Sequence, residues 1–160
     1  MIICLFFVYC IFLSSINNNS HLTNNHKSLT IGTIIANLFI LIGAGHGVGP
    51  IGIVEVFRFN SYFFHEPIKF SGSYDNTIPL SLIISLIGQL LLFVSLFNLP
   101  KQLKMCAICI LWLGFIYLTH NIVTGDKLSW FSFWSGTPFV ICSVILFIRT
   151  LLVAKQESTQ

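Results

Sequence analysis

The sequence predicts an all-α integral membrane protein, built as a four-helix bundle with a further short hydrophobic segment at its N-terminus. Hydrophobic residues make up 55% of the chain and charged residues only 8%, whereas a soluble domain has about 25% charged residues. The apolar residues gather in long runs, and three of these runs approach the roughly 20 residues that a helix needs to cross a bilayer. At 160 residues, the chain has no room beside such a bundle for a separate soluble domain.

The first 28 residues are expected to stand outside the bundle. Residues 1–16 are an apolar run that is too short for an easy membrane span and lacks the positively charged start of a secretory signal. Three interpretations stay open for it: a short extra helix, a signal-like segment, and a start site placed too far upstream. Residues 17–28 are polar, rich in asparagine and without hydrophobic periodicity, so they are predicted to be a flexible linker.

The membrane bundle is predicted over residues 29–155, followed by a polar tail at 156–160. Its four spans are expected at about 29–56, 78–99, 105–123 and 133–153. Pro100 ends the second span, because proline has no amide hydrogen with which to continue a helix. The turn after it is short and carries Lys101 and Lys104, so the second and third spans are expected to be antiparallel neighbours.

The first span contains the most specific stretch of the chain, GAGHGVGPIGIVE at residues 43–55. The apolar run before it is too short to cross a bilayer alone, so we expect the helix to continue through this stretch. Two overlapping GxxxG pairs clear one helix face for close packing, and the predicted packing residues are Gly43, Gly45, Gly47, Gly49 and Pro50. In such a helix Pro50 leaves the carbonyl of His46 without its hydrogen bond. We also expect Gly47→Leu to destabilise the bundle more than Gly125→Leu, which falls in a loop.

Two histidines inside the predicted spans, His46 and His120, are expected at a similar depth in the outer half of the membrane. Ionisable groups are costly there and normally face the interior of the bundle. The pair predicts either axial ligands for a haem iron or two of three ligands of a metal site, which Glu55, His65 or Glu66 would complete. The competing interpretation is a plain hydrogen-bond network in which Asn121 takes part. We therefore expect no cofactor, with a haem or a metal ion as the alternative.

The second span carries small and hydroxyl residues on one helix face. They are Ser81, Ser85, Gly88 and Ser95, with Gln89 at the edge of the face. We expect this face to turn inward and to serve close packing and modest interhelical hydrogen bonds. Ser81 and Ser85 are expected to line the same pocket as the histidines, and a substrate path is the alternative use of the face.

Lysine and arginine predict the orientation, because the cytoplasmic loops of membrane proteins carry an excess of both. One side of the predicted bundle carries five of these residues and the other side three. The five are Lys27, Lys101, Lys104, Arg149 and Lys155, and the three are Arg58, Lys69 and Lys127. Both ends of the four-span core are therefore expected on the cytoplasmic side.

Three hypotheses for function follow, and because the chain contains no complete catalytic motif, enzymatic activity stays open. The first is an accessory or structural subunit that packs through its glycine-rich first span, in contact with lipid and with another membrane protein or a second copy. The alternatives are a haem- or metal-binding redox protein using His46 and His120, and a small carrier or channel element. A net charge of +3, spread over several loops, argues against nucleic-acid binding, which requires a clustered basic face.

Overall fold

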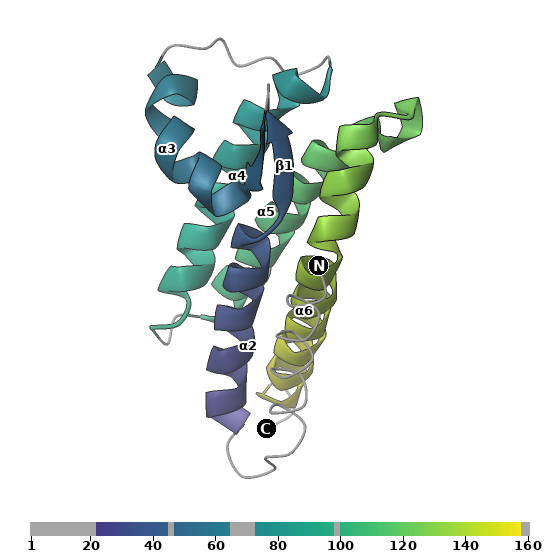
Figure 1. Ribbon diagram of the computed structural model, residues 1–160. Helices are drawn as coiled ribbons and strands as arrows, with labels where there is room; N and C mark the ends of the chain where they lie inside the picture. Colours follow the sequence, from purple (N-terminus) through teal and green to yellow (C-terminus); the bar gives the residue numbers. More distant parts are fainter. Residues whose placement is uncertain (1–21, 45–46, 65–72, 98–99, 158–160) are drawn as a thin grey trace.

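The computed structural model describes residues 22–44, 47–64, 73–97 and 100–157, and this part of the chain is mostly helical (Figure 1). The helices are α2 (Leu22–Leu38), α3 (Ile51–Phe64), α4 (Tyr74–Val94), α5 (Lys101–Thr119) and α6 (Lys127–Glu157), with a short 3₁₀ helix, η1 (His120–Thr124), after α5. Two short strands, β1 (Leu41–Ala44) and β2 (Gly47–Pro50), lie between α2 and α3. The predicted N-terminal segment 1–16 falls outside the described residues, as do Gly45 and His46.

Within the part of the chain that the structure describes, three helices are long and apolar enough to cross a membrane, over Tyr74–Val94, Lys101–Thr124 and Lys127–Val153. They correspond to the second, third and fourth predicted spans. The last of them begins six residues earlier than the predicted 133, because Asp126 caps its N-terminus. The Asp126 carboxylate accepts hydrogen bonds from the Leu128 amide at 3.2 Å and from the Ser129 hydroxyl at 2.9 Å, which satisfies donors that a helix start leaves free.

The first predicted span is not one helix, and this corrects the expectation for residues 29–56. Helix α2 ends at Leu38, and β1 and β2 then form an antiparallel hairpin in which Leu41 pairs with Pro50 and Ala44 with Gly47. The Ile51 amide closes the hairpin by donating to the Ile40 carbonyl at 2.7 Å. Glycine destabilises the interior of a helix, so the glycine-rich residues after Leu38 do not continue α2. The hairpin gives their backbone amides and carbonyls hydrogen-bond partners, which they would lack at the end of an interrupted helix.

Pro50 therefore does not act as a helix breaker above His46. It ends β2 directly before the first residue of α3, where a missing amide hydrogen costs little because the first turn of a helix has unpaired amides in any case.

Together, α2, the hairpin and α3 extend over the same length as the continuous helices beside them (Figure 1). Helix α2 starts at the end of the bundle where α5 begins and α6 finishes, and it stops near the middle. The hairpin and α3 occupy the other half. Helix α2 packs mainly against α6 and also against α4, whereas α3 packs against α4 and β1 against α6.

The hairpin is held to α6 by serine side chains. The Ser132 hydroxyl donates to the Leu41 carbonyl at 2.9 Å, and the Leu41 amide donates to the Ser135 hydroxyl at 3.0 Å. The apolar side chains around this anchor are closed off from solvent, with Ile40 and Ile42 fully buried. The backbone of β1 thus obtains hydrogen bonds from α6 that it cannot make within the hairpin.

The described glycines of this segment, Gly43, Gly47 and Gly49, do not form one packing face, because strands present them differently from a helix. A Cβ added at Gly43 would lie 2.7 Å from a methyl carbon of Leu128, so this glycine is used in packing inside the chain. At Gly47 it would meet nothing within 4 Å, and at Gly49 only Val54 at 3.7 Å. The expected order of Gly47→Leu and Gly125→Leu is also corrected, since Gly125 has φ 79° at the end of η1, a conformation that disfavours every side chain.

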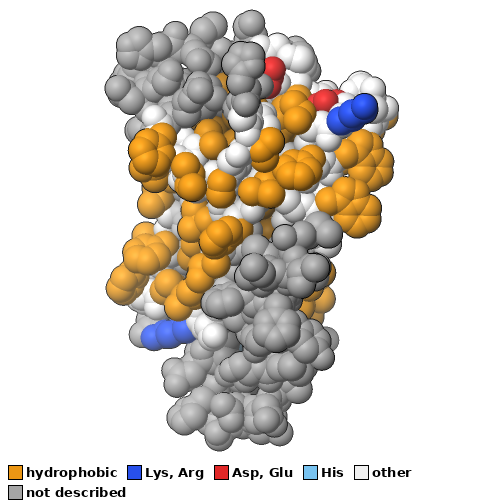
Figure 2. Space-filling view, in the orientation of Figure 1, with side chains coloured by type: hydrophobic (Ala, Val, Ile, Leu, Met, Phe, Trp, Pro, Cys, Tyr) orange, Lys and Arg blue, Asp and Glu red, His pale blue; other side chains and the backbone are white. Residues whose placement is uncertain are grey.

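The small-residue face of α4 does turn inward, as predicted. Ser81, Ser85, Gly88, Gln89 and Ser95 are all buried. On the outside of the bundle, hydrophobic side chains cover the middle of the face drawn in Figure 2, and its described charged side chains lie toward the two ends. That distribution is the one expected of a protein whose middle is surrounded by lipid.

Candidate functional site

Four polar side chains are buried together inside the bundle, and we call them the Glu55 cluster. They are Asn37, Glu55, Ser85 and Gln89, with exposed fractions of 2%, 6%, 3% and 7%. Polar groups buried among helices of a membrane protein are costly unless they bond to one another, and an ionisable one is a candidate functional residue. The cluster is therefore the strongest candidate site in the described part of the chain.

The break in the first segment builds this cluster. Asn37 lies in the last turn of α2 and Glu55 in the second turn of α3, 18 positions later. In one continuous helix these residues would be about 27 Å apart at 1.5 Å per residue. The hairpin cancels that distance by folding back on itself, so α3 restarts close to where α2 stopped. Ser85 and Gln89, one turn apart on α4, then face both pieces.

The hydrogen bonds of the cluster converge on the amide of Gln89. Its nitrogen lies 2.6 Å from Asn37 Oδ1, 3.2 Å from Ser85 Oγ and 3.3 Å from Glu55 Oε1. The Ser85 hydroxyl donates to Asn37 Oδ1 at 2.8 Å. The Glu55 carboxyl group thus accepts a hydrogen bond from the neutral Gln89 of α4, and in the described structure no cation is among the groups that act on it.

His120 is placed differently from the prediction. It is exposed, its Nδ1 lies 2.8 Å from the carbonyl oxygen of Tyr117 in the last turn of α5, and its ring stacks on that of Tyr117 with centroids 5.5 Å apart. Glu55 instead bonds to Gln89. Because His46 lies outside the described residues, its pairing with His120 stays a prediction. Among the residues that the structure describes, no three His, Cys, Asp or Glu side chains gather closely enough to hold a metal ion.

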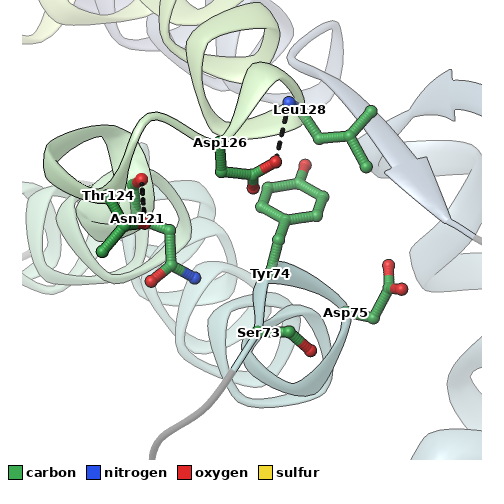
Figure 3. Close-up of a pocket in the computed structure, with 7 residues that line it drawn as sticks. All are labelled: Ser73, Tyr74, Asp75, Asn121, Thr124, Asp126 and Leu128. Atoms are coloured by element: carbon green, nitrogen blue, oxygen red, sulfur yellow. Dashed lines mark hydrogen bonds between the residues drawn. The ribbon is translucent and has the colours of Figure 1, made fainter.

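Asn121 lies in a separate open pocket of about 370 Å³ at the end of the bundle where α4 and α6 begin (Figure 3). The pocket is lined by Ser73, Tyr74, Asp75, Asn121, Thr124, Asp126 and Leu128. The predicted single pocket is therefore divided: Ser85 and Glu55 lie in the buried cluster, whereas Asn121 belongs to this surface pocket. Ser81 joins neither group through its hydroxyl, which donates to the Ile78 carbonyl of its own helix at 2.9 Å.

The two amide side chains of the cluster, Asn37 and Gln89, were not among the site residues predicted from the sequence. Gln89 stood only at the edge of the small-residue face, and Asn37 was one polar residue in an apolar run. An amide inside a predicted membrane span is itself a signal, because its two donors and its acceptor all require partners there. The position of Asn37 in an apolar run therefore predicts that its side chain is hydrogen-bonded, but not which residues are its partners.

Comparison with known proteins adds no assignment: no family model, curated protein or solved structure matches this chain.

Proposed function

We propose that this protein is a small multi-pass membrane carrier or channel element that binds a small cation at the Glu55 cluster. The observation that carries the proposal is a buried carboxyl group, bonded to the neutral side chain of Gln89, beside the interruption between α2 and α3. Transport proteins build ion sites at such interruptions, because the ends of the helix pieces and the side chains near them can replace the water around an ion. Backbone that is neither helix nor closed barrel is tolerated at membrane depth only where protein covers it or water reaches it.

The proposal includes four crossings, with α2, the hairpin and α3 counted together as the first. Lys27 near the start of α2 and Lys101 and Lys104 at the start of α5 support a cytoplasmic location of that end. Asp75 and Asp126 begin α4 and α6 at the opposite end. Exposed large side chains such as Phe57, Leu113 and Ile148 support contact with membrane lipid along the middle.

Ion flux through the purified protein in liposomes tests the proposal. A membrane potential is imposed, and entrapped dyes report proton and Na⁺ entry separately. We expect flux of one cation above that of empty liposomes, and we expect Glu55→Gln to abolish it, because the substitution removes the negative charge while keeping size and hydrogen-bonding capacity.

Asp75→Asn is the matched control, because it removes a carboxylate that is exposed at the start of α4. Both variants should keep the helical circular dichroism and the melting temperature of the wild type. Wild-type liposomes that conduct no better than empty ones, or an unchanged flux in Glu55→Gln, would refute the proposed function.

The accessory-subunit hypothesis remains as a second proposal, in which another membrane protein or a second copy packs on the hairpin. Its support is now limited to the outer part of the hairpin, where Gly47 meets nothing within 4 Å and Val48 is 59% exposed. Gly43 is already used against Leu128. The redox hypothesis rests on His46 and His120 and keeps the status of a prediction.

A further inference from the structure

We propose that the cation held by the Glu55 cluster is a proton, carried on Glu55 as a neutral carboxylic acid. This inference deepens the proposed function, which leaves the identity of the cation open. The hydrogen bonds around the Glu55 carboxyl group support it, because few donors are directed at its oxygens.

The hydrogen bonds of the cluster direct few hydrogens at the Glu55 carboxyl group, fewer than an ionised carboxylate needs. The nitrogen of Gln89 carries two hydrogens but has three oxygens within bonding distance, from Asn37, Ser85 and Glu55. The shortest of these contacts, 2.6 Å, goes to Asn37 and not to Glu55. The carboxyl oxygen obtains one long contact of 3.3 Å, whereas a stable buried carboxylate typically accepts two or three good hydrogen bonds.

Ser85 shows where the missing hydrogen belongs. Its Oγ and Glu55 Oε1 both lie within bonding distance of the Gln89 nitrogen, but the only hydrogen of the hydroxyl is donated to Asn37 Oδ1 at 2.8 Å. A protonated Glu55 would donate to the free lone pairs of Ser85 Oγ. The result is a directed chain from the acid through the hydroxyl to the Asn37 carbonyl oxygen, in which each hydroxyl both accepts and donates and so strengthens the next bond.

A metal cation fits this arrangement poorly. Na⁺ requires several oxygen atoms directed at one point, and here a hydrogen-bearing amide nitrogen stands between the oxygens of Asn37 and Glu55. Gln89 would have to rotate its amide by half a turn to present Oε1, and Asn37 Oδ1 would then lose a donor. The surrounding groups from α2 and α4 are neutral amides and a hydroxyl, so nothing positive in the described cluster stabilises a permanent carboxylate.

The proton balance of the site is simple. On uptake, Glu55 forms an O–H bond to a proton delivered by hydronium, which leaves as water. On release, that bond breaks, the proton returns to water on the other side of the membrane, and the carboxylate remains. No redox partner or second substrate is needed.

Infrared spectroscopy of the intact protein in lipid discs at neutral pH tests the inference, because an un-ionised carboxylic acid has a carbonyl band of its own. We expect such a band in the wild type and its loss in Glu55→Gln. Ser85→Ala should keep the band but shift it toward that of an acid without a hydrogen-bond acceptor. Ser81→Ala, which removes a hydroxyl bonded only within its own helix turn, should leave the band in place.

The infrared band and the flux are independent, so their failures are distinguishable. Absence of a band that depends on Glu55, or its disappearance when Na⁺ is added, overturns proton binding even if liposomes conduct. A band without any flux retains the protonated Glu55 and refutes the carrier or channel function. A band that Ser85→Ala does not move would overturn the proposed donation from Glu55 to Ser85.

Discussion

Helices α4, α5 and α6 pass through the bundle without interruption, whereas α2, the hairpin and α3 cover a similar length in three pieces (Figure 1). A continuous helix satisfies its own backbone, so its side chains serve mainly for packing. The interrupted segment must obtain hydrogen bonds elsewhere, and it takes them from Ser132 and Ser135 of α6. In return it places Asn37 and Glu55 beside α4. The interruption therefore weakens the local structure and creates the candidate site.

The largest stability effect is expected in the uninterrupted half, where α4 and α5 approach closely. A Cβ added at Gly88 would lie 2.8 Å from Leu111 Cγ and 3.1 Å from the Leu111 backbone nitrogen. Because the helix backbone has little room to move, Gly88→Leu should lower the free energy of unfolding by about 1–3 kcal/mol. Gly47→Leu in the hairpin, where an added Cβ would meet no atom within 4 Å, is the control and should change the free energy of unfolding little. Unfolding in detergent mixtures measures both, and equal effects would contradict the comparison.

An intermediate change in the free energy of unfolding is expected where α6 donates a hydrogen bond to the interrupted segment. Ser132→Ala removes the donor to the Leu41 carbonyl and also the partner of the Tyr74 hydroxyl. We expect a loss of about 1 kcal/mol, within the range of single interhelical hydrogen bonds in membranes. Hydrogen exchange should show faster exchange in β1 than in α5. Thr137→Ala should leave the stability unchanged, because the Thr137 hydroxyl bonds only to the Phe133 carbonyl of the same helix. A similar loss of stability in this variant would contradict the role of Ser132 in holding the hairpin to α6.

The smallest change in the free energy of unfolding is expected from the loss of a side-chain hydrogen bond between two uninterrupted helices. Trp112 Nε1 of α5 donates to the Ser143 hydroxyl of α6 at 2.8 Å. Trp112→Phe keeps most of the packing against Phe147 and loses this bond, so the free energy of unfolding should fall by about 0.6 kcal/mol. Trp134→Phe, at a side chain that is 59% exposed, provides the matched control. A loss of stability in Trp112→Phe well above that in Ser132→Ala would contradict the expected order of these two hydrogen bonds.

The sequence by itself was enough to predict a membrane environment for this protein and the positions of its continuous helices. Long apolar runs with few charges leave a bilayer as the natural surroundings, and they locate three helices that are long enough to cross it. The inward face of α4 also followed from residue spacing, because small residues repeated at helical intervals favour a packed surface. These features depend on neighbours within one turn or one helix.

Only the tertiary structure decided the site. Whether residues 39–50 continue a helix or fold back depends on partners that are remote in sequence, such as Ser132 and Ser135, more than 90 positions away. Local helical spacing separates Asn37 and Glu55 by several turns, and it groups Glu55 with the histidines. The hairpin reverses the separation of Asn37 from Glu55, because two paired strands return the chain to its starting depth whereas a helix of the same residues carries it onward.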